Sequence, residues 1–146
     1  MKKRVIVIDG PPLSGKSTLG KLLSNRTRIP WLDVFELQRI MFRYKIVDGV
    51  VSDAAWNAFF CVLDQELKAG QEIIISGMFH RKDLHGKLRQ VIKKNKADMM
   101  IISCYAPDFR IAERIEERRV NINTAIYKKK MTMKEYSRIL QDYVRI

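Results

Sequence analysis

Hydrophobic and polar residues alternate in blocks along this chain, and the blocks predict strands and helices in turn. Apolar, largely β-branched runs at residues 5–8, 72–78 and 99–105 are typical of strands buried on both faces, and 31–34 is a shorter run of the same kind. Between these runs, apolar residues recur every three or four positions, as they do on one face of a helix. We therefore expect four strands that alternate with helices.

The predicted helices each have one apolar face. They cover 16–24, 35–44, 53–70 and 80–95, and two more begin near 107 and 133. Their apolar faces are Leu19, Leu22 and Leu23; Leu37, Ile40 and Met41; Trp56, Phe59, Phe60, Leu63 and Leu67; Leu84, Leu88, Val91 and Ile92; Ile111, Ala112 and Ile115; and Tyr136, Leu140 and Val144. Ser52 with Asp53 can cap the third helix, and Thr132 with Glu135 forms a capping-box pattern before the last. The alternation predicts an α/β fold in which helices wrap a parallel sheet on both sides.

Chain length and composition narrow the class of protein. A chain of 146 residues is the size of one domain, so we expect a single domain spanning 1–146, and 47% hydrophobic residues argue against disorder. No apolar run approaches the roughly 20 residues that cross a bilayer. Cys61 and Cys104 lack the spacing of a zinc site or a structural disulfide. These features predict a cytoplasmic protein that does not enter a membrane.

The balance of charges points to anionic partners. Lysine and arginine total 28 against 16 acidic residues, which gives a net charge of +12. Such an excess favours nucleotide phosphates, nucleic acid or both. The predicted helix at 80–95 is both basic and amphipathic, whereas the aromatic stripe of Trp56, Phe59 and Phe60 is better explained as core than as a base-stacking platform.

One motif carries a specific chemistry. Residues 10–17 read Gly-Pro-Pro-Leu-Ser-Gly-Lys-Ser and fit the phosphate-loop (P-loop) pattern G-x-x-x-x-G-K-[ST] between a predicted strand and a predicted helix. The glycines let backbone N–H groups converge on phosphate oxygens, Lys16 reaches the β- and γ-phosphates, and Ser17 ligates Mg²⁺. The expected nucleotide-binding residues are Gly10, Pro11, Pro12, Leu13, Ser14, Gly15, Lys16, Ser17 and Thr18.

The order of motifs resembles a known family. Residues 5–18 resemble the opening of small P-loop kinases of the nucleoside-monophosphate-kinase-like group, notably cytidylate kinases, and Asp33 and Arg39 resemble their second-strand Asp and following Arg. The later segments 77–82, 104–107 and 114–119 resemble gluconate-kinase-like, zeta-toxin-like and polynucleotide-kinase-like phosphotransferases. The resemblance implies a three-layer P-loop sandwich, ATP (or GTP) and Mg²⁺ as cofactors, and a lid over about 107–131.

Two departures from the family leave the acceptor open. Cytidylate kinases carry Gly-Arg-Asp after the third strand, where this chain has Ser76-Gly77-Met78-Phe79. The resemblance also implies a fifth strand and a loop against the adenine, whereas this sequence finishes on the predicted helix at 133–144. A partner, a truncation or a reduced sheet would each explain that difference.

Further polar residues are candidates for the acceptor site and the lid. Asp33 follows an apolar strand, where it can orient an acceptor hydroxyl, act as its base, hold a Mg²⁺-bound water, or simply cap the next helix. Arg39, with His80 and Arg81, is a candidate for acceptor binding, although a solvated Arg39 is a comparable reading. The resemblance places phosphate-binding arginines among Arg114, Arg118 and Arg119, which can instead pair with neighbouring glutamates; of these, Arg114 and Arg118 share a helical face.

These features together predict an ATP-dependent phosphotransferase with a small, nucleotide- or nucleoside-like acceptor. Lys16, Asp33, Arg114 and Arg118 are its expected catalytic residues. The alternatives are a kinase acting on polynucleotide 5′-hydroxyl groups and a nucleotide-binding interaction module with little turnover. Weak, nonspecific nucleic-acid binding is expected alongside, and the sequence leaves homo-oligomer formation open.

Overall fold

The protein is built on a four-stranded, all-parallel sheet. The computed structural model describes residues 3–42, 51–79, 81–120 and 132–142. The strands are β1 (Arg4–Asp9), β2 (Trp31–Asp33), β3 (Ile73–Gly77) and β4 (Asp98–Ser103), in the spatial order β2-β3-β1-β4. Val7 at the middle of β1 pairs with Ile75 on one side and Ile101 on the other. The α/β fold with a parallel sheet expected from the sequence is confirmed.

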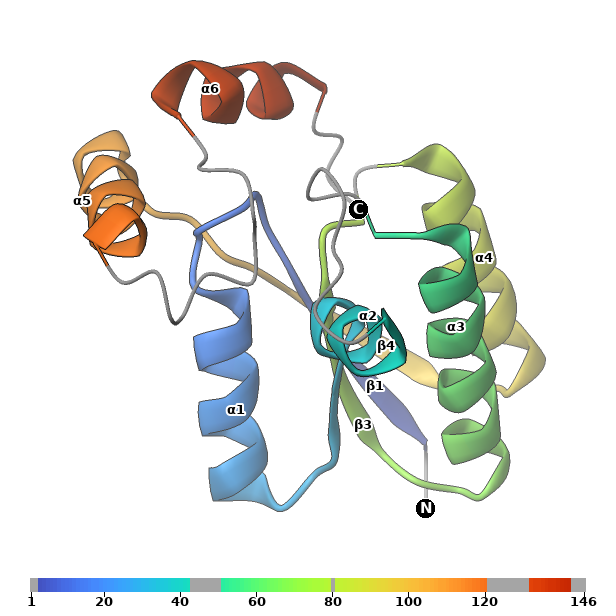
Figure 1. The fold of residues 1–146 in the computed structure, drawn as a ribbon. Coiled ribbons are helices and arrows are strands. Elements are labelled where there is room, and N and C mark those ends of the chain that lie inside the picture. The colour runs from blue at the N-terminus through green and yellow to red at the C-terminus, as the bar shows by residue number, and fades with distance from the viewer. Residues whose placement is uncertain (1–2, 43–50, 80, 121–131, 143–146) are drawn as a thin grey trace.

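Helices lie on both faces of this sheet. They are α1 (Lys16–Thr27), α2 (Val34–Phe42), α3 (Asp53–Lys68), α4 (Lys82–Lys94), α5 (Asp108–Val120) and α6 (Met133–Asp142). Figure 1 shows α1 on one side of the sheet and α3 and α4 on the other, with α5 and α6 beyond the carboxyl ends of the strands. Within the described ranges, no helix combines the length and apolar character that crossing a bilayer requires.

Local capping signals position two of these helices as expected. Ser52 Oγ accepts a hydrogen bond from the backbone N–H of Ala55 at 3.1 Å and so begins α3. Before α6, the Thr132 backbone N–H donates to the Glu135 carboxylate at 2.9 Å, and the Glu135 N–H donates to Thr132 Oγ1 at 3.2 Å. This reciprocal pair is a capping box, which satisfies two N–H groups that the helix leaves unpaired.

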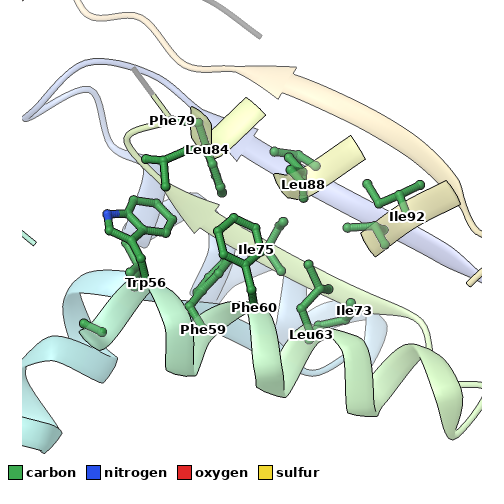
Figure 2. Packing of buried hydrophobic residues seen from close by; sticks show 14 of the residues in the cluster. Trp56, Phe59, Phe60, Leu63, Ile73, Ile75, Phe79, Leu84, Leu88 and Ile92 are labelled. Atoms are coloured by element: carbon green, nitrogen blue, oxygen red, sulfur yellow. The ribbon is translucent and has the colours of Figure 1, made fainter. Parts of the chain in front are cut away.

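The main hydrophobic core fills the space between α3, α4 and the sheet. Trp56, Phe59 and Phe60 from α3 meet Phe79, which follows β3 (Figure 2). The ring centroids of Trp56 and Phe79 are 5.3 Å apart, and those of Trp56 and Phe59 are 5.4 Å apart in an edge-on arrangement. Leu84, Leu88 and Ile92 of α4 close the cluster from the other side. The expectation that the α3 aromatics are core residues is confirmed.

Several expectations about apolar segments are wrong in detail. Leu22, on the predicted apolar face of α1, is 49% exposed. Val34 is the first residue of α2 rather than the end of a strand, because the Asp33 side chain already caps the helix there. On α2, Ile40 is 71% exposed, and the buried residues are Val34 and Gln38. Strand β4 is not buried on both faces: it lies at the sheet edge, and Met100 is 49% exposed.

Candidate functional site

The P-loop lies between β1 and α1, as the motif predicted. A Cβ at Gly10 would come within 2.6 Å of the Cys104 carbonyl oxygen and 2.7 Å of Ser14 Oγ, so only glycine fits there. Gly15 has φ of +96°, in the left-handed region that glycine adopts without strain. No side chain caps α1 at this position. The first N–H groups of α1 are therefore available to an anion, and the positive end of the helix dipole lies beside them.

Two polar side chains of the loop suit a phosphate. The Lys16 side chain is buried, and its Nζ donates to the Pro11 carbonyl oxygen at 2.7 Å, which holds the positive charge within the curl of the loop. Ser14 Oγ is buried and has no hydrogen-bond partner among the described residues. An unpaired buried hydroxyl is costly, and phosphate oxygens would supply the acceptor that it lacks.

Asp33 connects the P-loop to the second and third strands. Its Oδ2 accepts hydrogen bonds from Ser17 Oγ at 3.2 Å and from Ser76 Oγ at 2.5 Å. Its Oδ1 accepts from the backbone N–H groups of Phe35 at 2.9 Å and Glu36 at 3.0 Å. The two readings of Asp33 are therefore compatible, since one oxygen caps α2 while the other faces the P-loop serine. Burial raises the pKa of Asp33, and the hydrogen bond from Ser76 is the largest opposing effect.

The Ser17–Asp33 pair suits Mg²⁺ rather than a softer metal. Both residues offer oxygen atoms, which are the ligands that Mg²⁺ prefers. The described residues contain no group of three or more His, Cys, Asp or Glu side chains able to hold a metal by themselves. Mg²⁺ fits this arrangement because it is commonly held by one or two protein groups together with substrate phosphates.

Arg114, one of the arginines expected in a lid, lies against the P-loop. Its Nη1 donates a hydrogen bond to the Leu13 carbonyl oxygen, and the same atom lies 4.0 Å from an ideal Cβ at Gly15. The helix is held there by a second hydrophobic cluster, in which Leu13 and Met133 pack against buried residues Ile111, Ile115 and Tyr136. The side chains of Arg118 and Arg119 lie outside the described residues, and so do residues 121–131 of the lid expected over about 107–131.

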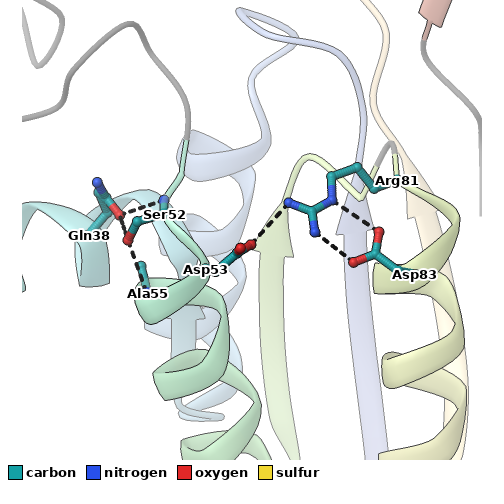
Figure 3. Close-up of polar contacts among 6 residues, drawn as sticks. All are labelled: Gln38, Ser52, Asp53, Ala55, Arg81 and Asp83. Atoms are coloured by element: carbon teal, nitrogen blue, oxygen red, sulfur yellow. Dashed lines mark hydrogen bonds and ion pairs between the residues drawn. The ribbon is translucent and has the colours of Figure 1, made fainter.

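The candidate acceptor residues are engaged in ion pairs. Arg39 pairs with Glu36 one turn earlier on α2. Arg81 forms a two-pronged contact with Asp83, at 3.0 Å and 2.6 Å, and reaches Asp53 at 3.3 Å, so that it joins the starts of α3 and α4 (Figure 3). The hydrogen bond with Asp83 raises the pKa of Arg81. His80 lies outside the described residues.

Sequence reasoning missed three polar residues that shape the site. Ser76 on β3 is fully buried and receives a hydrogen bond from Trp31 Nε1 at 2.8 Å while donating to Asp33. Asp9 at the end of β1 accepts from the Phe79 backbone N–H at 3.3 Å. Gln38 Oε1 accepts from both the backbone N–H and the hydroxyl of Ser52 (Figure 3). Ser76 and Asp9 are polar residues at the carboxyl ends of apolar strands, a position that could have signalled them.

Known structures share this architecture at low sequence identity. No protein-family model matches the chain, and no curated protein matches it. A presumed kinase from Chloroflexus aurantiacus is similar with a TM-score of 0.74 and 24% identity, over 84% of this chain and 70% of the other. A gluconokinase from Sinorhizobium meliloti has a TM-score of 0.66 and 17% identity, over 97% of this chain and 75% of the other. Kti12 from Chaetomium thermophilum, in complex with ADP-AlF3, has a TM-score of 0.62 and 16% identity, over 97% of this chain and 80% of the other.

These similarities and the loop geometry define the class of fold. The protein has the α/β fold of P-loop kinases, with a phosphate loop between its first strand and first helix. At these identities the comparisons establish the fold, and the chemistry has to be argued from the residues of the site.

Proposed function

We propose that this protein is a phosphotransferase that moves the γ-phosphoryl group of ATP to a small, nucleotide- or nucleoside-like acceptor. One observation carries the proposal: Ser17, at the start of α1, and Asp33, at the end of β2, meet at 3.2 Å beside a P-loop that encloses the Lys16 ammonium group. A phosphate-binding group, a magnesium ligand and a carboxylate are thus gathered at one edge of the sheet. The similarity to a protein that holds ADP-AlF3 supports a nucleotide at this edge.

Each residue has a distinct part in the proposed reaction. Lys16 neutralises charge on the β- and γ-phosphates, and Ser17 would turn from Asp33 to ligate Mg²⁺, which neutralises phosphate charge when bound. The lone pair of Asp33 Oδ2 that Ser17 releases then accepts the proton of the acceptor hydroxyl, as the hydroxyl oxygen forms a bond to the γ-phosphorus and the bond from that phosphorus to the ADP oxygen breaks. The guanidinium group of Arg114 exchanges its hydrogen bond to the Leu13 carbonyl oxygen for hydrogen bonds to the oxygens of the phosphoryl group that is transferred. Catalysis then rests on positioning and charge neutralisation, with no covalent enzyme intermediate.

A second acceptor class has one observation in its favour. The phosphates of a polynucleotide with a 5′-hydroxyl end would suit the exposed cations of α4, which begins at the same edge of the sheet as the P-loop (Figure 1). Nucleosides, nucleotides and oligonucleotides therefore belong in the same assay.

The test is an acceptor screen read by product mass. The protein is incubated with ATP and Mg²⁺ and pooled nucleosides, nucleoside monophosphates and 5′-hydroxyl oligonucleotides, and we expect one class to gain a phosphate. Lys16→Ala should abolish that transfer, whereas Lys21→Ala, an exposed lysine on the same helix, should leave it unchanged. Nucleotide binding without transfer to any acceptor would favour the interaction-module alternative. Full activity in a folded Lys16→Ala protein would overturn the proposal.

A further inference from the structure

The outward face of α4 carries a row of exposed cations. Lys82, Arg89 and Lys93 are exposed, and with Gly86 they follow one another at intervals of four, three and four residues, which places them on one side of the helix. We name these four residues the α4 stripe. None of its three cations has a carboxylate within ion-pair distance in the described part of the chain. The only acidic residue of α4, Asp83, is already paired with Arg81.

Gly86 is not required by the fold. Glycine is among the poorest helix formers, and one use of glycine is to let a ligand approach the backbone closely. A Cβ at Gly86 would meet no atom within 4 Å, so no neighbouring element of the described chain demands the missing side chain. The gap lies between Lys82 and Arg89, in the middle of the stripe. An external ligand that approaches the helix there would account for it.

The chemistry of the surface favours a nucleic acid over a membrane. A helix that lies on a bilayer needs an exposed apolar face beside its cations. In α4 that face is buried, since Leu84, Leu88 and Ile92 pack into the main core. The stripe offers only positive charge and backbone, which match a regular row of phosphates.

The position of the stripe supports the same partner. α4 begins just after β3, at the carboxyl edge of the sheet where the P-loop lies, and runs down the side of the molecule opposite α1 (Figure 1). Over the eleven helical steps from Lys82 to Lys93 the helix advances about 16 Å. A nucleic-acid strand lying along this helix would place several of its phosphates against the stripe, and its end would reach the edge of the nucleotide site.

We propose that the α4 stripe is a docking surface for the sugar–phosphate backbone of a single-stranded nucleic acid, with Gly86 as the point of closest approach. This binding does not depend on the proposed phosphoryl transfer. The two are measured separately, so the failure of one leaves the other standing.

The first test compares two double variants of equal charge change. Arg89→Gln with Lys93→Gln removes two cations from the stripe, and Lys21→Gln with Arg26→Gln removes two exposed cations from α1, on the opposite side of the sheet. Binding is followed by fluorescence anisotropy of a labelled single-stranded oligonucleotide, without ATP, across a range of salt concentrations. The stripe variant should lower the slope of log affinity against log salt by about 1.4, or 0.7 for each lost phosphate contact. The α1 variant should leave the slope unchanged. Equal effects of the two variants would overturn the proposal.

The second test uses Gly86. Gly86→Gln adds a neutral side chain that favours the helix, so it should raise the melting temperature while weakening oligonucleotide binding about tenfold. Gly86→Ala, which adds a single methyl group, should bind with an intermediate affinity. Unchanged affinity in Gly86→Gln, or tighter binding to phosphatidylserine vesicles than to the oligonucleotide, would rule out the proposed surface.

Discussion

The guanidinium group of Arg114 donates a hydrogen bond to the backbone carbonyl of Leu13, 101 positions earlier in the chain. Leu13 is at the tip of the P-loop with φ of +64°, a conformation that non-glycine residues seldom adopt. Its side chain packs against the cluster of Ile111, Ile115 and Tyr136. The phosphate loop and α5 are thus joined by a polar contact, and Leu13 also packs into the apolar cluster that α5 shares with α6.

Replacing Arg114 should therefore affect turnover more than nucleotide affinity. In Arg114→Ala we expect kcat to fall by about 10²- to 10³-fold, the usual effect of losing a preorganised donor to the transition-state charge. Steady-state kinetics with an equilibrium measurement of nucleotide binding test this. Arg110→Ala is the matched control, because Arg110 is exposed on the same helix and pairs with Glu113. A wild-type kcat in Arg114→Ala would show that Arg114 takes no part in the transfer step.

Ser76→Ala should destabilise the protein and slow transfer. The hydroxyl of Ser76 accepts a hydrogen bond from Nε1 of the half-buried Trp31 and donates one to Asp33, so its loss leaves an indole N–H unpaired. We expect the free energy of unfolding to fall by about 1–3 kcal/mol. The double variant Ser76→Ala with Trp31→Phe should lose less than the sum of the single changes, because phenylalanine has no N–H to satisfy. Strictly additive losses in chemical denaturation would contradict the proposed coupling.

The ionisation of Asp33 should lower stability as the pH rises. Burial raises its pKa above the ordinary value of 3.8, so the folded protein holds this proton more tightly than the unfolded chain does. Unfolding free energy is then lost as the pH passes from 3.8 up through the folded pKa. Asp33→Asn, measured without nucleotide or Mg²⁺, should gain stability relative to wild type over that interval. The same variant should lose phosphoryl transfer.

Asp64→Asn provides a control of opposite sign for this experiment. Hydrogen bonds from Lys68, Asn95 and Lys94 lower the pKa of Asp64. The ionised Asp64 carboxylate therefore stabilises the folded protein at pH values above the pKa that this group has in the unfolded chain, and this stabilisation is lost as the pH falls. Asp64→Asn should therefore be less stable than wild type at neutral pH, with the difference shrinking in acid. A same-signed pH trend in both variants would show that neither reports on its own carboxylate.

Two glycines should respond to alanine in opposite directions. Gly86 lies inside α4 with open space around its missing Cβ, so Gly86→Ala should stabilise the protein by about 0.4–1 kcal/mol. Gly70 has φ of +83°, which strains any other residue, so Gly70→Ala should destabilise it by about 1 kcal/mol. Thermal or chemical denaturation of the two variants measures both changes in stability. A loss of stability in Gly86→Ala would mean that α4 needs its glycine for folding.

The sequence by itself determined the features that depend on neighbouring residues. The apolar runs predicted the four strands, and the P-loop motif predicted the turn between β1 and α1. The starts of α3 and α6 were predicted from capping side chains that accept a hydrogen bond from an N–H group three residues later. Sequence alone can show these features because the apolar pattern of a strand, the glycines of a loop and the cap of a helix each involve residues that are only a few positions apart. The position of Asp33 after an apolar strand also predicted that it is a site residue.

Tertiary structure decided what meets across the chain. Only the packing of β2 beside β3 brings Ser76 and Trp31 to Asp33, and only the cluster around Leu13 selects Arg114 for contact with the P-loop. The exposure of Ile40 and Met100 likewise depends on which elements cover α2 and β4. Periodicity predicts that a face is apolar, but the partner that covers it is set by contacts between distant segments, and no local pattern encodes those contacts.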